Sequence, residues 1–150
     1  MKIKRIIILV MIISLLCISG CSGTKEEEKE AEVPNFYETV AGTYHEETAG
    51  RGQLVISTTK EDGADVEIRW SSSAAEYSVW NMHIYYNEEN AHLDYKDGSR
   101  TDHVVDSDGN ENSEVIYTDG SGYFEVGEDN LTWYEDNSDA NDGAVFVIDK

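Results

Sequence analysis

The thiol of Cys21 is the side chain whose position and neighbours predict the clearest chemistry. It follows Ile18, Ser19 and Gly20, a branched apolar residue and two small residues. Small residues let the backbone enter the active site of a peptidase, and a thiol supplies a nucleophilic sulfur once it is ionised. The tetrapeptide therefore makes the Cys21 sulfur the first candidate for covalent modification.

Residues 1–20 have the order of a secretory signal, with a short basic start and an uncharged apolar run over 6–18. A membrane-spanning helix needs about 20 apolar residues, so this run is short for one. Together with Ile18–Cys21, the segment resembles the lipobox signal of bacterial lipoproteins. The resemblance implies cleavage after Gly20 and a diacylglycerol thioether on Cys21, whose two acyl chains suffice to anchor the protein to the extracytoplasmic face of the cell membrane. An ordinary secretory signal is the alternative.

Cleavage would leave a chain without a free thiol, because Cys17 departs with the signal and Cys21 is acylated. Cysteine nucleophiles, cysteine-ligated zinc and redox motifs are then excluded. Loss of three basic residues with the signal would change the formal net charge from −20 to −23. Such a surface repels nucleic acid and attracts cations or a basic protein. Solubility outside the cell is the alternative meaning of this charge.

Paired acids are the candidates for acid–base catalysis. The pairs Glu46-Glu47, Glu88-Glu89 and Glu135-Asp136 lie in expected loops or at strand ends. A glycosidase needs two carboxylates across a cleft, one of them with a pKa raised by apolar surroundings. Alternation places Glu67 and Glu125 on the side opposite their apolar neighbours. We therefore interpret these acids as solvated and predict no catalytic residue.

Two loops, 106–111 and 137–143, are rich in the oxygen ligands that calcium prefers. Neither fits an EF-hand, which has glycine at loop position six and glutamate at position twelve. Counted from Asp106, those positions hold Glu111 and Tyr117, and the glycine of the second loop comes one place late. A calcium site of another kind stays open beside the simpler interpretation, a hairpin turn and a polar loop.

Histidine offers no clearer site. The four histidines lack zinc-ligand spacing, and neither a Gly-x-Ser-x-Gly context nor a glycine-rich phosphate loop occurs. We expect surface or strand histidines, and no metal or cofactor site. The histidines are His45, His83, His92 and His103.

The elements that must position these residues begin after residue 35. Residues 21–35 are strongly charged, nearly free of apolar side chains, and include the only proline, Pro34. This composition predicts a disordered, self-extending tether. At ~3.3 Å per residue it could hold the following domain some tens of ångströms from a membrane.

Residues 36–150 have the pattern of an all-β domain. Apolar and polar residues alternate with a period of two, as in Val66, Ile68 and Trp70. Asp-Gly pairs at 62–63, 97–98, 108–109, 119–120 and 142–143 favour the tight turns of hairpins. The expected strands are Tyr37–His45, Gln53–Thr58, Ala64–Trp70, Tyr77–Tyr86, His92–Tyr95 continuing to Val105, Glu111–Tyr117, Gly122–Val126, Leu131–Glu135 and Ala144–Ile148.

Strands in this order predict an antiparallel meander closed into a small barrel, because closure removes exposed sheet edges. Asp97-Gly98 is either a turn or a bulge within one strand, and we expect eight or nine strands in the closed barrel. Gly42-Thr43-Tyr44 on the first strand is similar to the Gly-x-Trp of lipocalin-type barrels, with Tyr44 in place of the tryptophan. Together with Asp108–Glu111, it also resembles small lipoprotein domains of Gram-positive gut bacteria, a resemblance that implies a fold and a location but no activity.

The interior of such a barrel holds either a ligand or side chains. The number of large inward residues, including Trp70, Trp80 and Trp133, favours a filled core. Outward tyrosines such as Tyr85 and Tyr134 are candidates for stacking on a sugar or a partner protein.

We therefore expect a membrane-anchored lipoprotein that presents a non-catalytic, lipocalin-like β-barrel as a binding module. Its partner would be a cationic protein, a small molecule or a glycan, and not nucleic acid. Two alternatives remain: an inhibitor of a cationic wall-degrading enzyme such as lysozyme, and a glycan-acting enzyme that uses a carboxylate pair.

Overall fold

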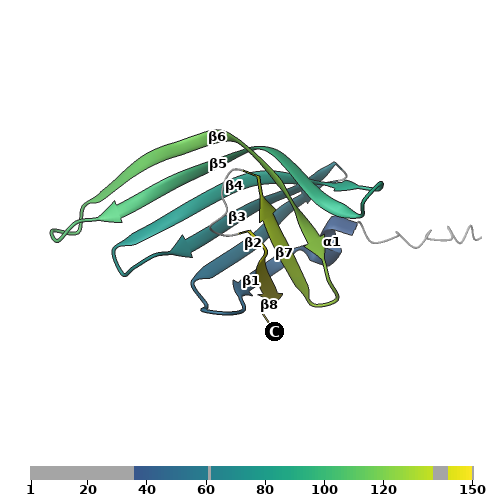
Figure 1. The fold of residues 1–150 in the computed structure, drawn as a ribbon, viewed down its shortest axis with the longest axis horizontal. Helices are drawn as coiled ribbons and strands as arrows, with labels where there is room; N and C mark the ends of the chain where they lie inside the picture. The colour runs from purple at the N-terminus through teal and green to yellow at the C-terminus, as the bar shows by residue number, and fades with distance from the viewer. Residues whose placement is uncertain (1–35, 61, 137–141, 150) are drawn as a thin grey trace, which may run out of the picture. The chain divides into compact units, whose positions relative to one another are not determined.

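A computed structural model describes residues 36–60, 62–136 and 142–149 (Figure 1). Each strand pairs antiparallel with the next, and the last strand pairs with the first, which closes an eight-stranded barrel. The predicted all-β closed meander is thus confirmed, with eight strands. In order the elements are α1 (Phe36–Val40), β1 (Gly42–Glu46), β2 (Gly52–Lys60), β3 (Gly63–Ser71), β4 (Glu76–Asn87), β5 (His92–Val105), β6 (Glu111–Val126), β7 (Asn130–Glu135) and β8 (Ala144–Ile148).

The start of the domain differs from the prediction. A strand was expected from Tyr37, but Phe36–Val40 forms the short helix α1, and β1 begins at Gly42. Tyr37 and Val40 are three residues apart, so both point to the barrel from one side of the helix and both are buried. The Tyr37 hydroxyl accepts a hydrogen bond from the Tyr86 amide at 2.9 Å. Burial against the end of the barrel therefore decides the helical conformation. In the described part of the chain no helix is long and apolar enough to cross a membrane.

The second difference concerns Asp119-Gly120, which was expected to be a turn between two strands. It lies inside β6, where Gly120 pairs with Gly98 of β5. Across from it, Asp97 has a φ of 56° and forms a bulge, since the ladder advances three residues from Tyr95 to Gly98 and two from Gly122 to Gly120. The bulge alternative is therefore right, and a ninth strand does not exist in the described residues. The Asp-Gly pairs at 62–63, 108–109 and 142–143 do border hairpins.

Large side chains fill the inside of the barrel, as the number of inward aromatic residues predicted. The Trp80 and Trp133 rings meet edge to face with centroids 5.4 Å apart. The largest fully buried side chains are Trp133, Phe124, Phe146, Leu54, Ile68, Ile84, Leu93 and Leu131. A core of this kind stabilises the fold by apolar burial and close packing.

The strands have unequal lengths, and this gives the barrel two different ends. In an up-and-down meander the β1–β2, β3–β4, β5–β6 and β7–β8 connections lie at one end, here called the mouth. The other end carries α1, which contacts β2. β5 and β6 run well past β7 at the mouth, because the pairing of β6 with β7 stops at Gly122 (Figure 1). We call residues 98–105 and 111–120 the extension.

Candidate functional site at the barrel mouth

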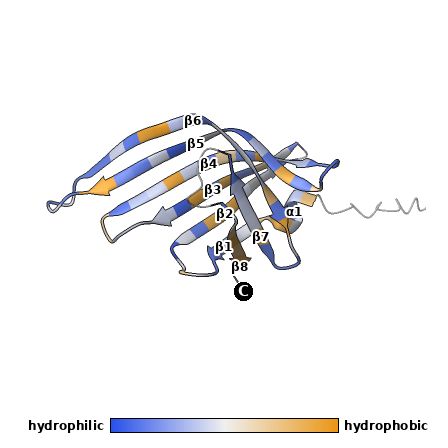
Figure 2. Cartoon of the chain, in the orientation of Figure 1, coloured by the Kyte–Doolittle hydropathy of each residue, from blue (hydrophilic) through white to orange (hydrophobic). Residues whose placement is uncertain are grey.

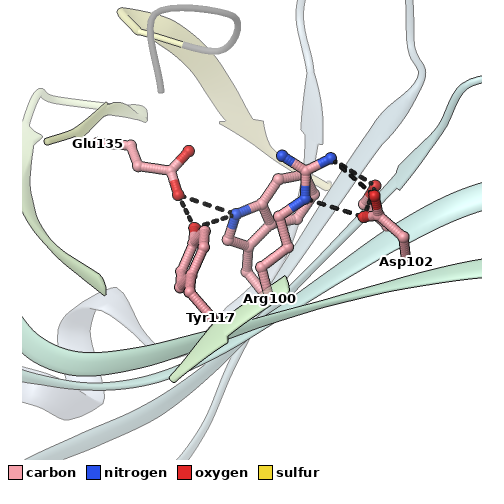
Figure 3. Close-up of polar contacts among 6 residues, drawn as sticks. Arg100, Asp102, Tyr117 and Glu135 are labelled. Atoms are coloured by element: carbon pink, nitrogen blue, oxygen red, sulfur yellow. Dashed lines mark hydrogen bonds and ion pairs between the residues drawn. The ribbon is translucent and has the colours of Figure 1, made fainter. Parts of the chain in front are cut away.

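A cluster of polar side chains lies on the inner face at the mouth (Figure 3). Strand alternation turns Ser78 and Trp80 of β4 inward, and the register places Asp102 opposite Ser78 and Arg100 opposite Trp80. Tyr117 of β6 lies opposite Arg100. The last residue of β7 completes the mouth cluster, which consists of Ser78, Trp80, Arg100, Asp102, Tyr117 and Glu135.

Arg100 and Asp102 form a bidentate ion pair in this cluster. The Arg100 Nε donates to Asp102 Oδ1 at 2.9 Å, and Nη2 donates to Oδ2 at 3.1 Å. The Ser78 hydroxyl donates to Oδ1 at 2.7 Å. Burial by itself would raise the pKa of Asp102, but the hydrogen bonds from Arg100 and Ser78 outweigh it and hold that pKa below its ordinary value. Asp102 is therefore ionised at neutral pH and balances the charge of Arg100.

The pKa of Glu135 is shifted in the opposite direction from that of Asp102. Its side chain is buried, and Oε1 accepts hydrogen bonds from Trp80 Nε1 at 3.0 Å and from the Tyr117 hydroxyl. No described residue donates a hydrogen bond to Oε2. Burial raises the pKa of Glu135, while the Trp80 hydrogen bond and the charge of Arg100 oppose that rise. Glu135 therefore keeps its proton to a higher pH than an exposed glutamate does.

The two carboxyl groups thus have pKa values shifted in opposite directions, which is the property of an acid–base pair. A catalytic acid must also come within hydrogen-bond reach of the substrate. Glu135 is only 6% exposed, so in this structure a substrate does not reach it. The cluster acts as a polar closure of the mouth, because its hydrogen bonds join β4, β5, β6 and β7.

Two acids predicted to be solvated are in fact buried. Glu135 follows Leu131 and Trp133 at alternate positions of β7, and this alternation points all three side chains inward. Glu46 accepts hydrogen bonds from the Thr48 amide at 2.7 Å and the Ala49 amide at 2.8 Å, and so fixes the β1–β2 turn. Burial would raise the pKa of Glu46, but these amides lower it below its ordinary value. Glu67, Glu88, Glu89 and Glu125 are exposed, as predicted.

Each histidine lies against a carboxylate rather than beside another histidine. The closest nitrogen–oxygen distances are 2.6 Å for His45–Asp149, 2.8 Å for His83–Asp65, 3.8 Å for His92–Glu125 and 2.9 Å for His103–Glu111. Two of the rings also stack on tyrosine, His92 on Tyr123 and His103 on Tyr77. Within residues 36–60, 62–136 and 142–149, no group of three or more histidine, cysteine or acidic side chains could hold a metal ion.

The loop 106–111 is a hairpin turn held by its own aspartate. Asp106 Oδ1 accepts hydrogen bonds from the amides of Asp108 at 2.9 Å and Asn110 at 2.8 Å. The predicted hairpin turn between β5 and β6 is thus confirmed. Most of the second candidate loop, 137–141, lies outside the described residues, as do Cys21 and Gly20.

The outward aromatic side chains form a stack on the barrel exterior. Tyr123 lies between His92 and Tyr134, with ring centroids 4.3 Å and 4.7 Å away. The Tyr134 hydroxyl lies 3.4 Å from Glu125 Oε2. Because Tyr134 presents one ring face to Tyr123, only its other face remains for a sugar or a partner. Ligand stacking by Tyr85 and Tyr134 stays a prediction.

Sequence reasoning missed the mouth cluster as a unit. Arg100, Tyr117 and Glu135 meet only through the register of β5, β6 and β7, and bulges alter that register. The sequence carries a signal for Glu135 alone, because it continues the inward alternation of Leu131 and Trp133.

No family model, curated protein or solved structure matches the chain. Its class is therefore defined by its own structure, a closed eight-stranded antiparallel barrel with a filled interior and a polar closure at one mouth.

Proposed function

We propose that this protein is a lipid-anchored, extracytoplasmic lipoprotein that presents a non-catalytic barrel as a binding module. The single observation that carries the proposal is the filled interior, which leaves the exterior and the extension as the surfaces where a partner can bind. The lipobox resemblance of Ile18–Cys21 supports the anchor. The lipocalin-type resemblance of Gly42–Tyr44 is supported by Tyr44, which is buried and donates its hydroxyl to Val40 O at 2.7 Å.

The charge of the exterior favours a cationic protein as the partner. Residues 101–149 contain no lysine or arginine. Arg100 is paired with Asp102, so it does not offset the surrounding acids. Opposite charges speed and orient association between proteins. Inhibition of a cationic wall-degrading enzyme such as lysozyme is one form of this function.

The proposal is tested with the full chain in nonionic detergent and three probes. Lysozyme should bind at low salt and more weakly at high salt, while acetylated lysozyme, with its lysine charges removed, should not bind. A fluorescent fatty acid should leave the emission of the buried tryptophans unchanged. Uptake of the fatty acid with quenching of that emission would contradict the proposal and indicate an internal ligand. Failure of lysozyme to bind at low salt would remove the inhibitor form of the function.

A second candidate is hydrolysis of a glycan, favoured by the opposed pKa shifts of Glu135 and Asp102. It requires the mouth to open so that a sugar reaches Glu135. Release of reducing ends from cell-wall glycan by the full chain, abolished in Glu135→Gln and retained in the control Glu88→Gln, would support it. No release by the unaltered protein would reject it.

A further inference from the structure

One side of β6 is a free sheet edge. Residues 111–120 pair with β5, and β7 joins β6 only from Gly122 onward, with one more hydrogen bond of 3.0 Å from the Asp136 amide to Ser121 O. No strand among the described residues lies on the other side of 111–120. At ~3.3 Å per residue this edge is roughly 30 Å long. Figure 1 shows it as the outer margin of the extension.

One hydrogen bond shows which way the backbone amides and carbonyls of β6 point. The Asp106 amide donates to Asn110 O at 2.9 Å, so these two residues form a hydrogen-bonded pair next to the turn. Bonded and non-bonded pairs alternate along an antiparallel ladder. The register from 111 to 115 is regular against 105 to 101. The amides and carbonyls of Glu111, Ser113 and Val115 therefore point away from β5, toward the free side.

This edge is long, and it lacks two of the features by which proteins protect an exposed strand, lysine and proline. Such edges are usually short, or they carry lysine or proline. β6 contains no lysine, arginine or proline. Val115 and Ile116 are 61% and 46% exposed, and Figure 2 shows apolar colour on the extension. A bulge at Ile116 interrupts the ladder, so the regular template is Glu111–Val115.

The charge around this template decides between possible occupants. Glu111 and Glu114 lie on it, and Asp106 and Asp108 lie in the adjoining turn. A second copy of the chain would bring a second set of the same acids to this edge, and the like charges of the two copies would repel each other. A basic extended segment would place lysine or arginine against them.

We propose that the free edge of β6 over Glu111–Val115 receives an extended segment of a partner protein, rich in lysine or arginine, by β-strand addition. Main-chain hydrogen bonds to Glu111, Ser113 and Val115 supply affinity in this mode, and the side chains supply selectivity. The inference rests on the proposed function and deepens it, since it names the surface and the kind of partner segment.

Amide hydrogen exchange of the full chain in nonionic detergent tests the edge directly. The probe is a short capped peptide of alternating lysine and valine, and the control peptide has glutamate in place of lysine. With the lysine peptide, the amides of Glu111, Ser113 and Val115 should exchange at least about tenfold more slowly. The amides of Asn112 and Glu114 should not change, because they already bond to β5. The glutamate peptide should change none of them.

Three variants separate strand addition from general attraction. Ser113→Pro removes an outward donor while leaving the amides that bond to β5, and should weaken peptide binding at least about tenfold. Val115→Lys should do the same through charge. Val104→Lys makes the same change in charge one strand further from the edge and should weaken binding much less. Melting curves of each variant confirm that it is folded.

The outcomes differ for the edge and for the proposed function. Protection at other residues, or unchanged peptide binding by folded Ser113→Pro, would contradict strand addition at this edge. Neither result would contradict the proposed binding module. Protection of the same amides without peptide, accompanied by dimer formation, overturns the partner segment in favour of a second copy. No response to the peptide also overturns it, and lysozyme binding measured on the same sample reports on the proposed function separately.

Discussion

The carboxyl group of Glu135 at the barrel mouth is both buried and incompletely hydrogen-bonded. It is enclosed by apolar and aromatic side chains, yet only one of its oxygens accepts hydrogen bonds within the described residues. An ionised carboxylate in such a place is unfavourable, because burial removes water without replacing all of its hydrogen bonds. The protonated form relieves that cost, and this makes Glu135 a group whose ionisation opposes folding.

Glu135→Gln should change how stability depends on pH. The folded chain holds the Glu135 proton more tightly than the unfolded chain, because the folded pKa lies above the ordinary value of 4.5. Stability from this group is therefore present below the ordinary pKa and is lost as pH rises toward the raised one. Glutamine cannot ionise, and its carbonyl can still accept from Trp80 and Tyr117.

The difference in melting temperature between Glu135→Gln and the unaltered protein should shift in favour of the variant by ~2–5 °C as the pH rises from about 4 to about 7. Thermal melts across that range measure it. Glu88→Gln, at an exposed position, is the control and should run parallel to the unaltered protein. A constant difference between Glu135→Gln and the unaltered protein at every pH would show that the pKa of Glu135 is not raised by folding.

At the scale of elements, β6 needs a glycine at position 122, where its pairing with β7 ends. A Cβ atom on Gly122 would lie 2.2 Å from Tyr134 O and 2.6 Å from the Tyr95 hydroxyl oxygen. Neither can move easily, since Tyr134 O belongs to the backbone and the Tyr95 hydroxyl accepts a hydrogen bond from Trp133 Nε1 at 3.1 Å. Close approach, rather than a turn, is the reason for this glycine.

Gly122→Ala should therefore lower the free energy of unfolding by about 1–3 kcal/mol through overpacking. Thr118→Ala, on the exposed part of the same strand, should change it by no more than about 0.5 kcal/mol. Urea unfolding of the two variants makes the comparison. Equal stability of the two would contradict the close contact at Gly122.

The Tyr37 hydroxyl is one of the contacts that attach the helix α1 to the other end of the barrel. Tyr37→Phe removes the acceptor of the Tyr86 amide and leaves that partly buried donor unpaired. The expected loss is about 1–2 kcal/mol of unfolding free energy. Tyr85→Phe on the outer face is the matched control, and urea unfolding measures both. A loss that is no larger for Tyr37→Phe than for Tyr85→Phe would show that the bond contributes little.

These elements also show what the sequence could predict. The period of two in strands such as β3 and β4, together with Asp-Gly pairs at three hairpins, suffices for the order of the strands and the closure of the barrel, but it left the count at eight or nine. The helix α1 is too short for a helical period to appear, and its conformation comes from covering the barrel end. Asp119-Gly120 has the composition of a turn, but in the fold it faces the bulge at Asp97-Gly98 and continues a strand.

At the scale of the whole molecule, the interior of the barrel is filled and the exterior is acidic, and different parts of the barrel have different roles. The core holds the barrel closed, the mouth cluster seals one end, and β6 presents a free edge without lysine or arginine. For the proposed binding module, the predicted lipid anchor would set where the barrel meets its partner. The anchor lies outside the described residues, and Cys21 carries the prediction.

Cys21→Ser should abolish lipid attachment when the chain is expressed in a bacterial host. Without the thiol no diacylglycerol thioether forms, and the lipobox resemblance implies that cleavage after Gly20 then fails. The unaltered protein should take up an alkyne-labelled fatty acid and partition with the membrane fraction, whereas Cys21→Ser should carry no label. Cys17→Ser is the matched control, because Cys17 leaves with the signal, and it should behave like the unaltered protein. Release of unlabelled, cleaved protein into the medium by the unaltered chain would instead establish the ordinary secretory signal.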